Sequence, residues 1–108
     1  NKLNAILNQR SNDILTANNW NVVQYAVLVH MIAQVSGLEA GELVHVIADA
    51  HIYDRHIPLV KELIKRQTYD APVFRMNPDV KDFYEFTVDD FELEDYKYGP
   101  QIKIPVAV

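Results

Sequence analysis

Residues 22–35 restrict the possible fold more than any other part of the sequence. Eleven of these fourteen residues are apolar, and only Gln24, His30 and Gln34 interrupt the run. A helix that is apolar on nearly every side has to be covered by other elements, so the run predicts a buried helix. The run is shorter than the roughly 20 residues that a membrane-spanning helix needs. The sequence therefore predicts a protein with no membrane segment.

The residues that flank this run predict where the helix starts and ends. Asn18 or Asn19 can cap its start, because an asparagine side chain accepts hydrogen bonds from free backbone N–H groups. Gly37 is expected just past its end, where a left-handed conformation favours glycine. Asn21 then lies in the first turn, near the positive end of the helix dipole. His30 is interpreted as a packed or surface residue rather than a ligand.

Two alternating stretches on either side of this helix predict strands. Residues 2–9 alternate between two sides and favour a strand, with Arg10 following at its end in a loop. Residues 42–53 predict a second strand, in which His51 and Tyr53 point the same way about 6–7 Å apart. The other face of this second strand is apolar throughout and is expected to pack on a helix; it consists of Val44, Val46, Ala48, Ala50 and Ile52.

Shorter elements are predicted in the C-terminal half of the chain. Residues 54–66 have the pattern of an amphipathic helix, with Pro58 suited to its first turn. Residues 71–76 and 91–94 each predict a short strand. The acidic residues around 89–95 are interpreted as a solvated edge.

The composition of the 108 residues bounds the class of protein. Apolar residues make up 49%, enough for one domain with a core. The net charge of −5 argues against a general nucleic-acid binder, so DNA is not an expected partner. The chain has no cysteine, which excludes disulfides and fits a cytoplasmic location. A metal site of His45, Asp49 and His51 on one strand face is the alternative, but no metal-binding motif supports it.

A polar segment, residues 9–13, carries a glutamine, an arginine, a serine, an asparagine and an aspartate in succession. The guanidinium of Arg10 can hold a phosphate through two charge-assisted hydrogen bonds, and the Ser11 hydroxyl can add a third. Asn21 offers a donor and an acceptor side by side, as recognition of a pyrimidine edge requires. The alternative is a polar loop without a ligand.

Three motifs give the sequence a resemblance to a known family. The first is Gln-Arg-Ser-x-Asp at residues 9–13, with Asn21 eight residues after the aspartate. The second is Asp-x-His-x-Tyr at residues 49–53, and the third is the terminal Pro-Val-Ala-Val of residues 105–108. In this order the motifs resemble those of thymidylate synthases. The resemblance extends over essentially all of the chain.

This resemblance implies a role for each matching residue. Arg10 and Ser11 resemble ligands of the dUMP phosphate, and Asn21 resembles the residue that pairs with N3 and O4 of the uracil ring. His51 and Tyr53 resemble the pair that binds the 3′-hydroxyl of the deoxyribose. Other members of these motifs complete the implied dUMP site, namely Asn12, Asp13 and Ile52.

The resemblance also implies a cosubstrate, a reaction and a fold. Asp13 and Ala107 resemble residues that contact 5,10-methylenetetrahydrofolate, which donates carbon and hydride when dUMP is methylated to dTMP. The family's nucleophile is a cysteine, which this chain lacks. Residues 1–108 are therefore expected to be the C-terminal part of a thymidylate synthase domain and to be inactive alone. The implied fold is α+β, a mixed twisted sheet with packed helices, in a homodimer that packs sheet against sheet.

Two alternatives to this interpretation stay open. One is a pyrimidine nucleotide hydroxymethylase of the same fold, and the other is an inactive folded core. The related dCMP hydroxymethylases carry Asp where this chain has Asn21, so Asn21 favours dUMP. A carboxamide can flip to suit uracil or cytosine, and the sequence does not show which neighbours orient it. Ala17 and Asn19 also stand where the family commonly has Gly and Pro, which leaves the shape of this loop open.

Overall fold

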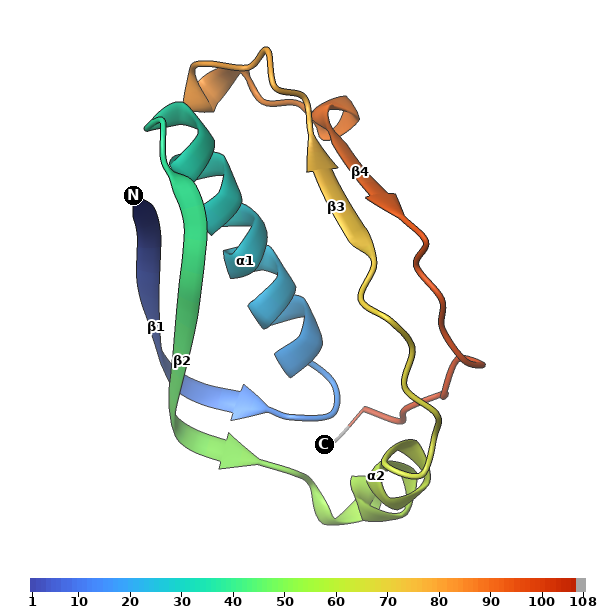
Figure 1. The fold of residues 1–108 in the computed structure, drawn as a ribbon. Coiled ribbons are helices and arrows are strands. Elements are labelled where there is room, and N and C mark those ends of the chain that lie inside the picture. Colours follow the sequence, from blue (N-terminus) through green and yellow to red (C-terminus); the bar gives the residue numbers. More distant parts are fainter. Residues whose placement is uncertain (107–108) are drawn as a thin grey trace.

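The computed structural model of the chain describes residues 1–106, so the predicted folate contact at Ala107 lies outside the described residues. Its first half is a strand-helix-strand unit of β1 (Lys2–Asp13), α1 (Asn18–Val35) and β2 (Glu39–His51). The strands β1 and β2 pair in parallel, and α1 is the crossover between them (Figure 1). This arrangement matches the predicted order of elements.

The second half of the described chain contains shorter elements. Strands β3 and β4 pair antiparallel in a sheet of their own. Parallel and antiparallel pairs therefore both occur, together with helices, and the predicted α+β class is confirmed. The elements are η1 (Asp54–His56), α2 (Ile57–Leu63), β3 (Val73–Met76), η2 (Phe83–Glu85), η3 (Val88–Asp90) and β4 (Phe91–Glu94).

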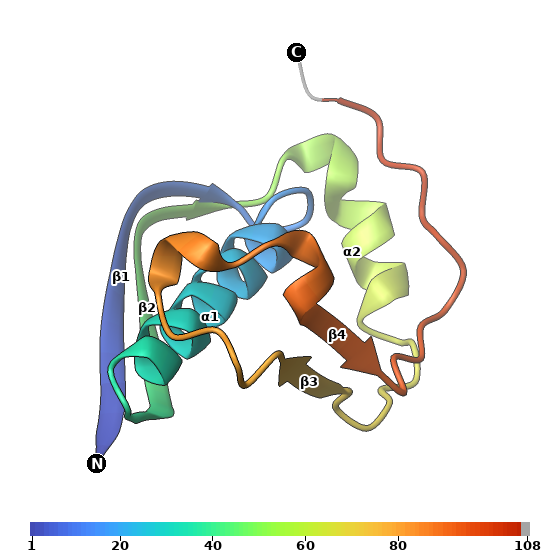
Figure 2. The ribbon, with the colours of Figure 1, turned by 90° about the horizontal axis from the view of Figure 1, so that it is seen from above.

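Helix α1 lies between the β1–β2 pair and the segment that holds β3 and β4 (Figure 2). On the side that faces β3, the His30 ring of α1 meets the Phe74 ring edge-on, with centroids 5.2 Å apart. The Gln34 side chain donates to the carbonyl oxygens of Asn77 and Val80 at 2.9 and 3.0 Å. These bonds tie a helix of the first half to the loop after β3.

The prediction that α1 is buried all round is wrong for the described chain. Only Val29 and Ala33 of this helix are buried, whereas Trp20 is 80% exposed and Val23 is exposed as well. The two sheets cover two sides of the helix and leave the rest open. No helix in residues 1–106 is long and apolar enough to cross a bilayer.

The start of α1 differs from its prediction. The N-cap is Ala17, and no side chain caps the helix there, because Asn18 and Asn19 are already helical residues. The φ angle of Ala17 is −122°, so this position does not need the conformational freedom of glycine. Asn21 lies in the first turn, as predicted, and its N–H makes a helical bond to the Ala17 carbonyl at 3.0 Å.

The end of α1 confirms the prediction for Gly37. Its φ angle is +69°, in the left-handed region. Its N–H donates to the Gln34 carbonyl at 3.2 Å, and the next N–H, from Leu38, donates to Ala33 at 2.9 Å. These two bonds form a Schellman motif, which satisfies carbonyls that the helix end leaves free.

The face of β2 that meets α1 is the opposite of the predicted one. Leu43 and the inward side chains of β1 line an apolar space beneath Leu28 and Val29 of the helix. Val44 and Val46, expected to pack on a helix, are 47% and 48% exposed on the outer face. A strand-helix-strand crossover has a fixed hand, and this hand decides which face the helix covers. Hydrophobic alternation carries no information about it.

Strand β1 is longer than predicted. It runs to Asp13, so Arg10 lies within a paired strand and the prediction of a loop at Arg10 is wrong. Ser11 lies opposite Asp49 and Asp13 opposite His51 in the ladder. Both strands bend together toward their C-terminal ends, which brings these ends around to the start of α1 (Figure 1).

Candidate functional site

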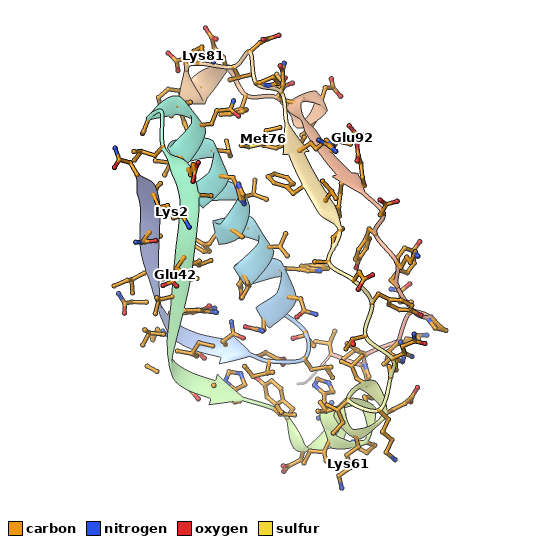
Figure 3. The ribbon with its side chains drawn as sticks, viewed as in Figure 1. Lys2, Glu42, Lys61, Met76, Lys81 and Glu92 are labelled. Carbon is orange, nitrogen blue, oxygen red and sulfur yellow. The ribbon has the colours of Figure 1, made fainter. Side chains whose placement is uncertain are left out.

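The C-terminal ends of β1 and β2 form one edge, and three predicted groups meet there. Residues 9–13 end β1, residues 49–53 end β2, and the first turn of α1 brings Asn21 to the same edge. Parallel strands present their carboxyl ends together, which is the usual place for a ligand in sheets of this kind. In Figure 3 this edge lies at the end of the molecule marked by Lys61, opposite the end marked by Lys81.

A network of side-chain hydrogen bonds surrounds Asn21. Its Oδ1 accepts from the Gln9 Nε2 and from the Asn12 Nδ2, each at 3.1 Å. The Gln9 Nε2 also donates to the Ser11 backbone carbonyl at 3.0 Å. The Gln9 Oε1 lies 2.8 Å from the His45 Nε2. The sequence did not show which residues orient Asn21, and the structure identifies them.

Asn12 is one of the few buried polar residues of the site, with 2% of its surface exposed. Its Nδ2 is used by Asn21, but its Oδ1 has no hydrogen-bond partner within residues 1–106. A buried acceptor without a partner is unfavourable by roughly 1–3 kcal/mol. Asn12 therefore holds a buried acceptor that no donor of residues 1–106 uses.

Asp49 connects the two motifs at the strand ends. Its Oδ2 accepts from the Ser11 hydroxyl at 3.4 Å. The His51 Nδ1 lies 3.2 Å from the Asp49 carbonyl oxygen and 3.5 Å from the Asp49 Oδ1. The Tyr53 ring meets the His51 ring edge-on, with centroids 5.4 Å apart. Ser11, His51 and Tyr53 are thus brought together, as the sequence predicted for the last two.

Arg10 is not part of this cluster. It is exposed and lines a shallow groove with Asn8, Val46 and Ala48 on the outer face of the sheet. Neighbouring residues of a strand point to opposite faces, so Arg10 and Ser11 diverge. No hydrogen bond or ion pair joins Arg10 to another side chain of residues 1–106. Its guanidinium is therefore available to an anion that reaches the strand end.

Asp13 closes the turn between β1 and α1. Its Oδ1 accepts from the backbone N–H groups of Leu15 and Thr16 at 3.2 and 3.3 Å. Burial alone would raise the pKa of Asp13, but these bonds, the Thr16 hydroxyl and the nearby His56 together lower it below its ordinary value of 3.8. Asp13 is thus held as a carboxylate at the site.

The C-terminal segment is fastened beside this turn by two residues that the sequence did not single out. His56 is fully buried, and its Nε2 lies 2.7 Å from the Pro105 carbonyl oxygen. The Arg55 Nη1 donates to the Val106 carbonyl at 3.2 Å. These contacts bring the last described residues to the same end of the molecule as Asp13. Only the residue types of Arg55 and His56, basic groups after a strand, could have indicated such a contact.

Sequence reasoning also missed the roles of Gln9, His45 and Asp49. Gln9 belongs to the first motif, and its position there was the one available signal. His45 shared a face with His51 and was weighed only as a metal ligand. Asp49 was weighed as a metal ligand and belongs to the second motif, but no role was assigned to it there. Within residues 1–106, no group of three histidine or acidic side chains is placed to hold a metal ion.

Comparisons with known proteins show the family of the chain. A family model for thymidylate synthases matches residues 1–108. Thymidylate synthases of Bacillus licheniformis and of Bacillus phage phi3T are each 50% identical over 107 residues, which are 99% of this chain and 38% of each relative. The solved thermostable thymidylate synthase A from Bacillus subtilis has a TM-score of 0.91 at 50% identity, over 94% of this chain and 36% of that one.

Sequence and fold thus define the same class, an α+β protein whose parallel strand ends carry a polar site. The chain belongs to the thymidylate synthase family. It spans 38% of the length of the two curated relatives named above.

Proposed function

We propose that the chain is the C-terminal part of a thymidylate synthase domain and forms one wall of a dUMP and folate site. The pairing of β1 with β2 supports this most strongly. It sets Ser11 beside Asp49, 38 residues away in the sequence, so that two motifs of the family meet at one edge. A fold that used these motifs only for packing would have no need to gather their polar groups there.

In this proposal each part of dUMP meets a different element. Asn21, in the first turn of α1, binds the uracil ring, while His51 and Tyr53 bind the 3′-hydroxyl of the deoxyribose. The Ser11 hydroxyl binds the phosphate, and Arg10 reaches the same phosphate from the opposite face, around the strand end. The Ser11 hydroxyl bond to Asp49, at 3.4 Å, is long for a hydroxyl-carboxylate bond, so the hydroxyl can turn to a phosphate oxygen. Asn12 and Ile52 complete this wall between the three groups.

The folate side of the site is proposed to lie at Asp13. Asp13 keeps a negative charge, and the fastened segment before Ala107 lies at the same end of the molecule. Bound 5,10-methylenetetrahydrofolate would supply the carbon and the hydride for methylation of dUMP. The chain has no cysteine, so the nucleophile of this reaction has to come from residues outside it.

We also propose that the enzyme is a homodimer joined through the outer face of β1 and β2. This face carries the exposed apolar side chains Ile6, Val44 and Val46. Exposed apolar patches on a sheet favour packing against another sheet. The cytoplasmic location and the absence of DNA as a partner stay predictions.

The test uses the enzyme expressed from its complete coding sequence. Incubation with dUMP and 5,10-methylenetetrahydrofolate is expected to form dTMP, with oxidation of the folate to dihydrofolate followed by absorbance. Formation of hydroxymethyl-dUMP instead, identified by mass spectrometry, would favour the hydroxymethylase alternative. The absence of both products would contradict the proposal.

Residues 1–108 on their own are expected to give no dTMP, because they lack the nucleophile. The same assay at matched concentration measures this. Turnover by the pure 108-residue chain would show that another group in it attacks the ring.

A further inference from the structure

We propose that His45 is a positioning residue that selects the pyrimidine, acting through Gln9 on Asn21. This inference rests on the proposed function, because it assigns specificity within the same dUMP site. Within residues 1–106, no hydrogen bond joins His45 to Asn21 or to the end of β2 that meets the substrate. It lies on β2, 36 residues after Gln9, and contacts it through the 2.8 Å bond.

The direction of the Gln9 carboxamide follows from one unambiguous partner. The Ser11 backbone carbonyl can only accept, so the Gln9 atom bonded to it at 3.0 Å has to be the Nε2 amide. The Gln9 Oε1 then faces His45, and the ring must donate a hydrogen from its Nε2. This bond holds the carboxamide against rotation.

The orientation of Asn21 follows from that of Gln9. The Gln9 Nε2 donates to Asn21 at 3.1 Å, so the contacted atom has to be the acceptor Oδ1. A second donor, the Asn12 Nδ2, reaches the same oxygen at 3.1 Å. An amide oxygen has two lone pairs, and both are used here, so a uracil N3–H that pairs with Asn21 has to take the place of the Asn12 donor. The Asn21 Nδ2 hydrogens are left to face the substrate.

This orientation distinguishes uracil from cytosine. The Nδ2 of Asn21 can donate to the O4 carbonyl of uracil, whereas the 4-amino group of cytosine would place two donors against each other. Asn12 cannot enforce this choice. Its Oδ1 has no partner, so the Asn12 carboxamide can rotate and pair with Asn21 in either orientation of the Asn21 carboxamide. Only Gln9 is anchored to the backbone, and His45 supports it on its other side.

The test compares variants of the complete enzyme by calorimetric titration with dUMP and with dCMP. His45→Leu keeps a side chain of similar size but removes the donor, and His45→Gln keeps a donor. We expect His45→Leu to lower the ratio of dUMP to dCMP affinity at least about tenfold, as expected for loss of a hydrogen bond that orients a half-buried donor. His45→Gln should restore most of it. His30→Leu, the same change at an exposed histidine of α1, should leave the ratio unchanged.

An unchanged ratio in folded His45→Leu, or an equal loss of both affinities, would overturn the proposal. If His45→Leu does not fold, the affinity ratio is measured in Gln9→Glu instead. The carboxylate of this variant accepts from His45 but cannot donate to Asn21. A ratio that falls in Gln9→Glu supports the proposal, and an unchanged ratio overturns it. Binding is measured without turnover, so an enzyme that prefers dUMP but forms no dTMP would contradict the proposed function and leave this inference standing.

Discussion

The two faces of the β1–β2 pair differ in a way that hydropathy would not suggest. The inner face meets α1, yet it carries Gln9, His45 and the polar network around Asn21. On β2 the outer face has the more uniform apolar set, with Val44 and Val46 about half exposed. On β1 the outer face is mostly polar, and its Ile6 is 68% exposed. The more apolar face of a single strand is therefore not always the face that the helix covers.

The difference shows how one small sheet can serve two purposes. The inner face can include polar residues because their hydrogen bonds are satisfied within a network and against the start of a helix. On the outer face the apolar side chains Ile6, Val44 and Val46 stay exposed, so they are suited to association. The proposed dimer and the proposed nucleotide site thus share two strands back to back.

A charge on the outer face should have the largest effect. We expect Val46→Asp to dissociate the complete enzyme into monomers, because two unpaired charges in an apolar interface are unfavourable by several kcal/mol. Light scattering after size-exclusion chromatography measures the mass. Val88→Asp, at an exposed valine of η3, is the matched control. A Val46→Asp variant that stays a dimer of unchanged stability would show that the outer face is not the dimer interface.

Arg10→Ala tests whether the outer face also contributes to the nucleotide site. Loss of a charge-assisted pair with a phosphate dianion should weaken dUMP binding about 100-fold, which corresponds to about 2–3 kcal/mol. Titration of the complete enzyme with dUMP measures it. Arg75→Ala, which removes an arginine already paired with Glu94 on the other sheet, serves as control. Equal dUMP affinities of Arg10→Ala and wild type would show that Arg10 does not bind the phosphate.

Gly41→Ala should disturb the strand that both faces share. A Cβ at Gly41 would overlap the Asn4 side chain and lie 2.8 Å from the Leu3 carbonyl oxygen. The Asn4 Oδ1 also accepts from the Glu42 N–H at 2.8 Å, beside the bulge of β2. We expect a loss of about 1–3 kcal/mol of unfolding free energy in urea denaturation. Gly99→Ala, whose nearest neighbour is the flexible Arg66 side chain, should change it less.

Asp13→Asn should give the smallest effect and only over part of the pH range. The folded pKa of Asp13 is below 3.8, so its ionised form stabilises the fold fully above that value and loses this effect as pH falls through the lowered pKa. The melting temperature of the variant should therefore be slightly lower than wild type at pH 6. The two should converge well below pH 3.8, and a difference that persists in acid would assign the effect to packing.

The sequence by itself determined the types and order of the main elements. The apolar run predicted α1, glycine at position 37 predicted its end, and the alternation of Phe91 to Glu94 predicted β4. These features are local, because periodicity and glycine conformation depend on a few neighbouring residues. The motifs at residues 9–13 and 49–53 also indicated the residues that the proposed site uses at the ends of β1 and β2.

Only the tertiary structure decided which face of the sheet α1 covers, and which residues orient Asn21. Val44 and Val46 on one face of β2 and Leu43 on the other are all apolar, so alternation does not choose between the faces. The choice depends on the path of the crossover. The bond from His45 to Gln9 spans 36 residues, and the bond from His56 to Pro105 spans 49. Contacts over such separations exist only once strands have paired and bent, because no local pattern encodes a distant partner.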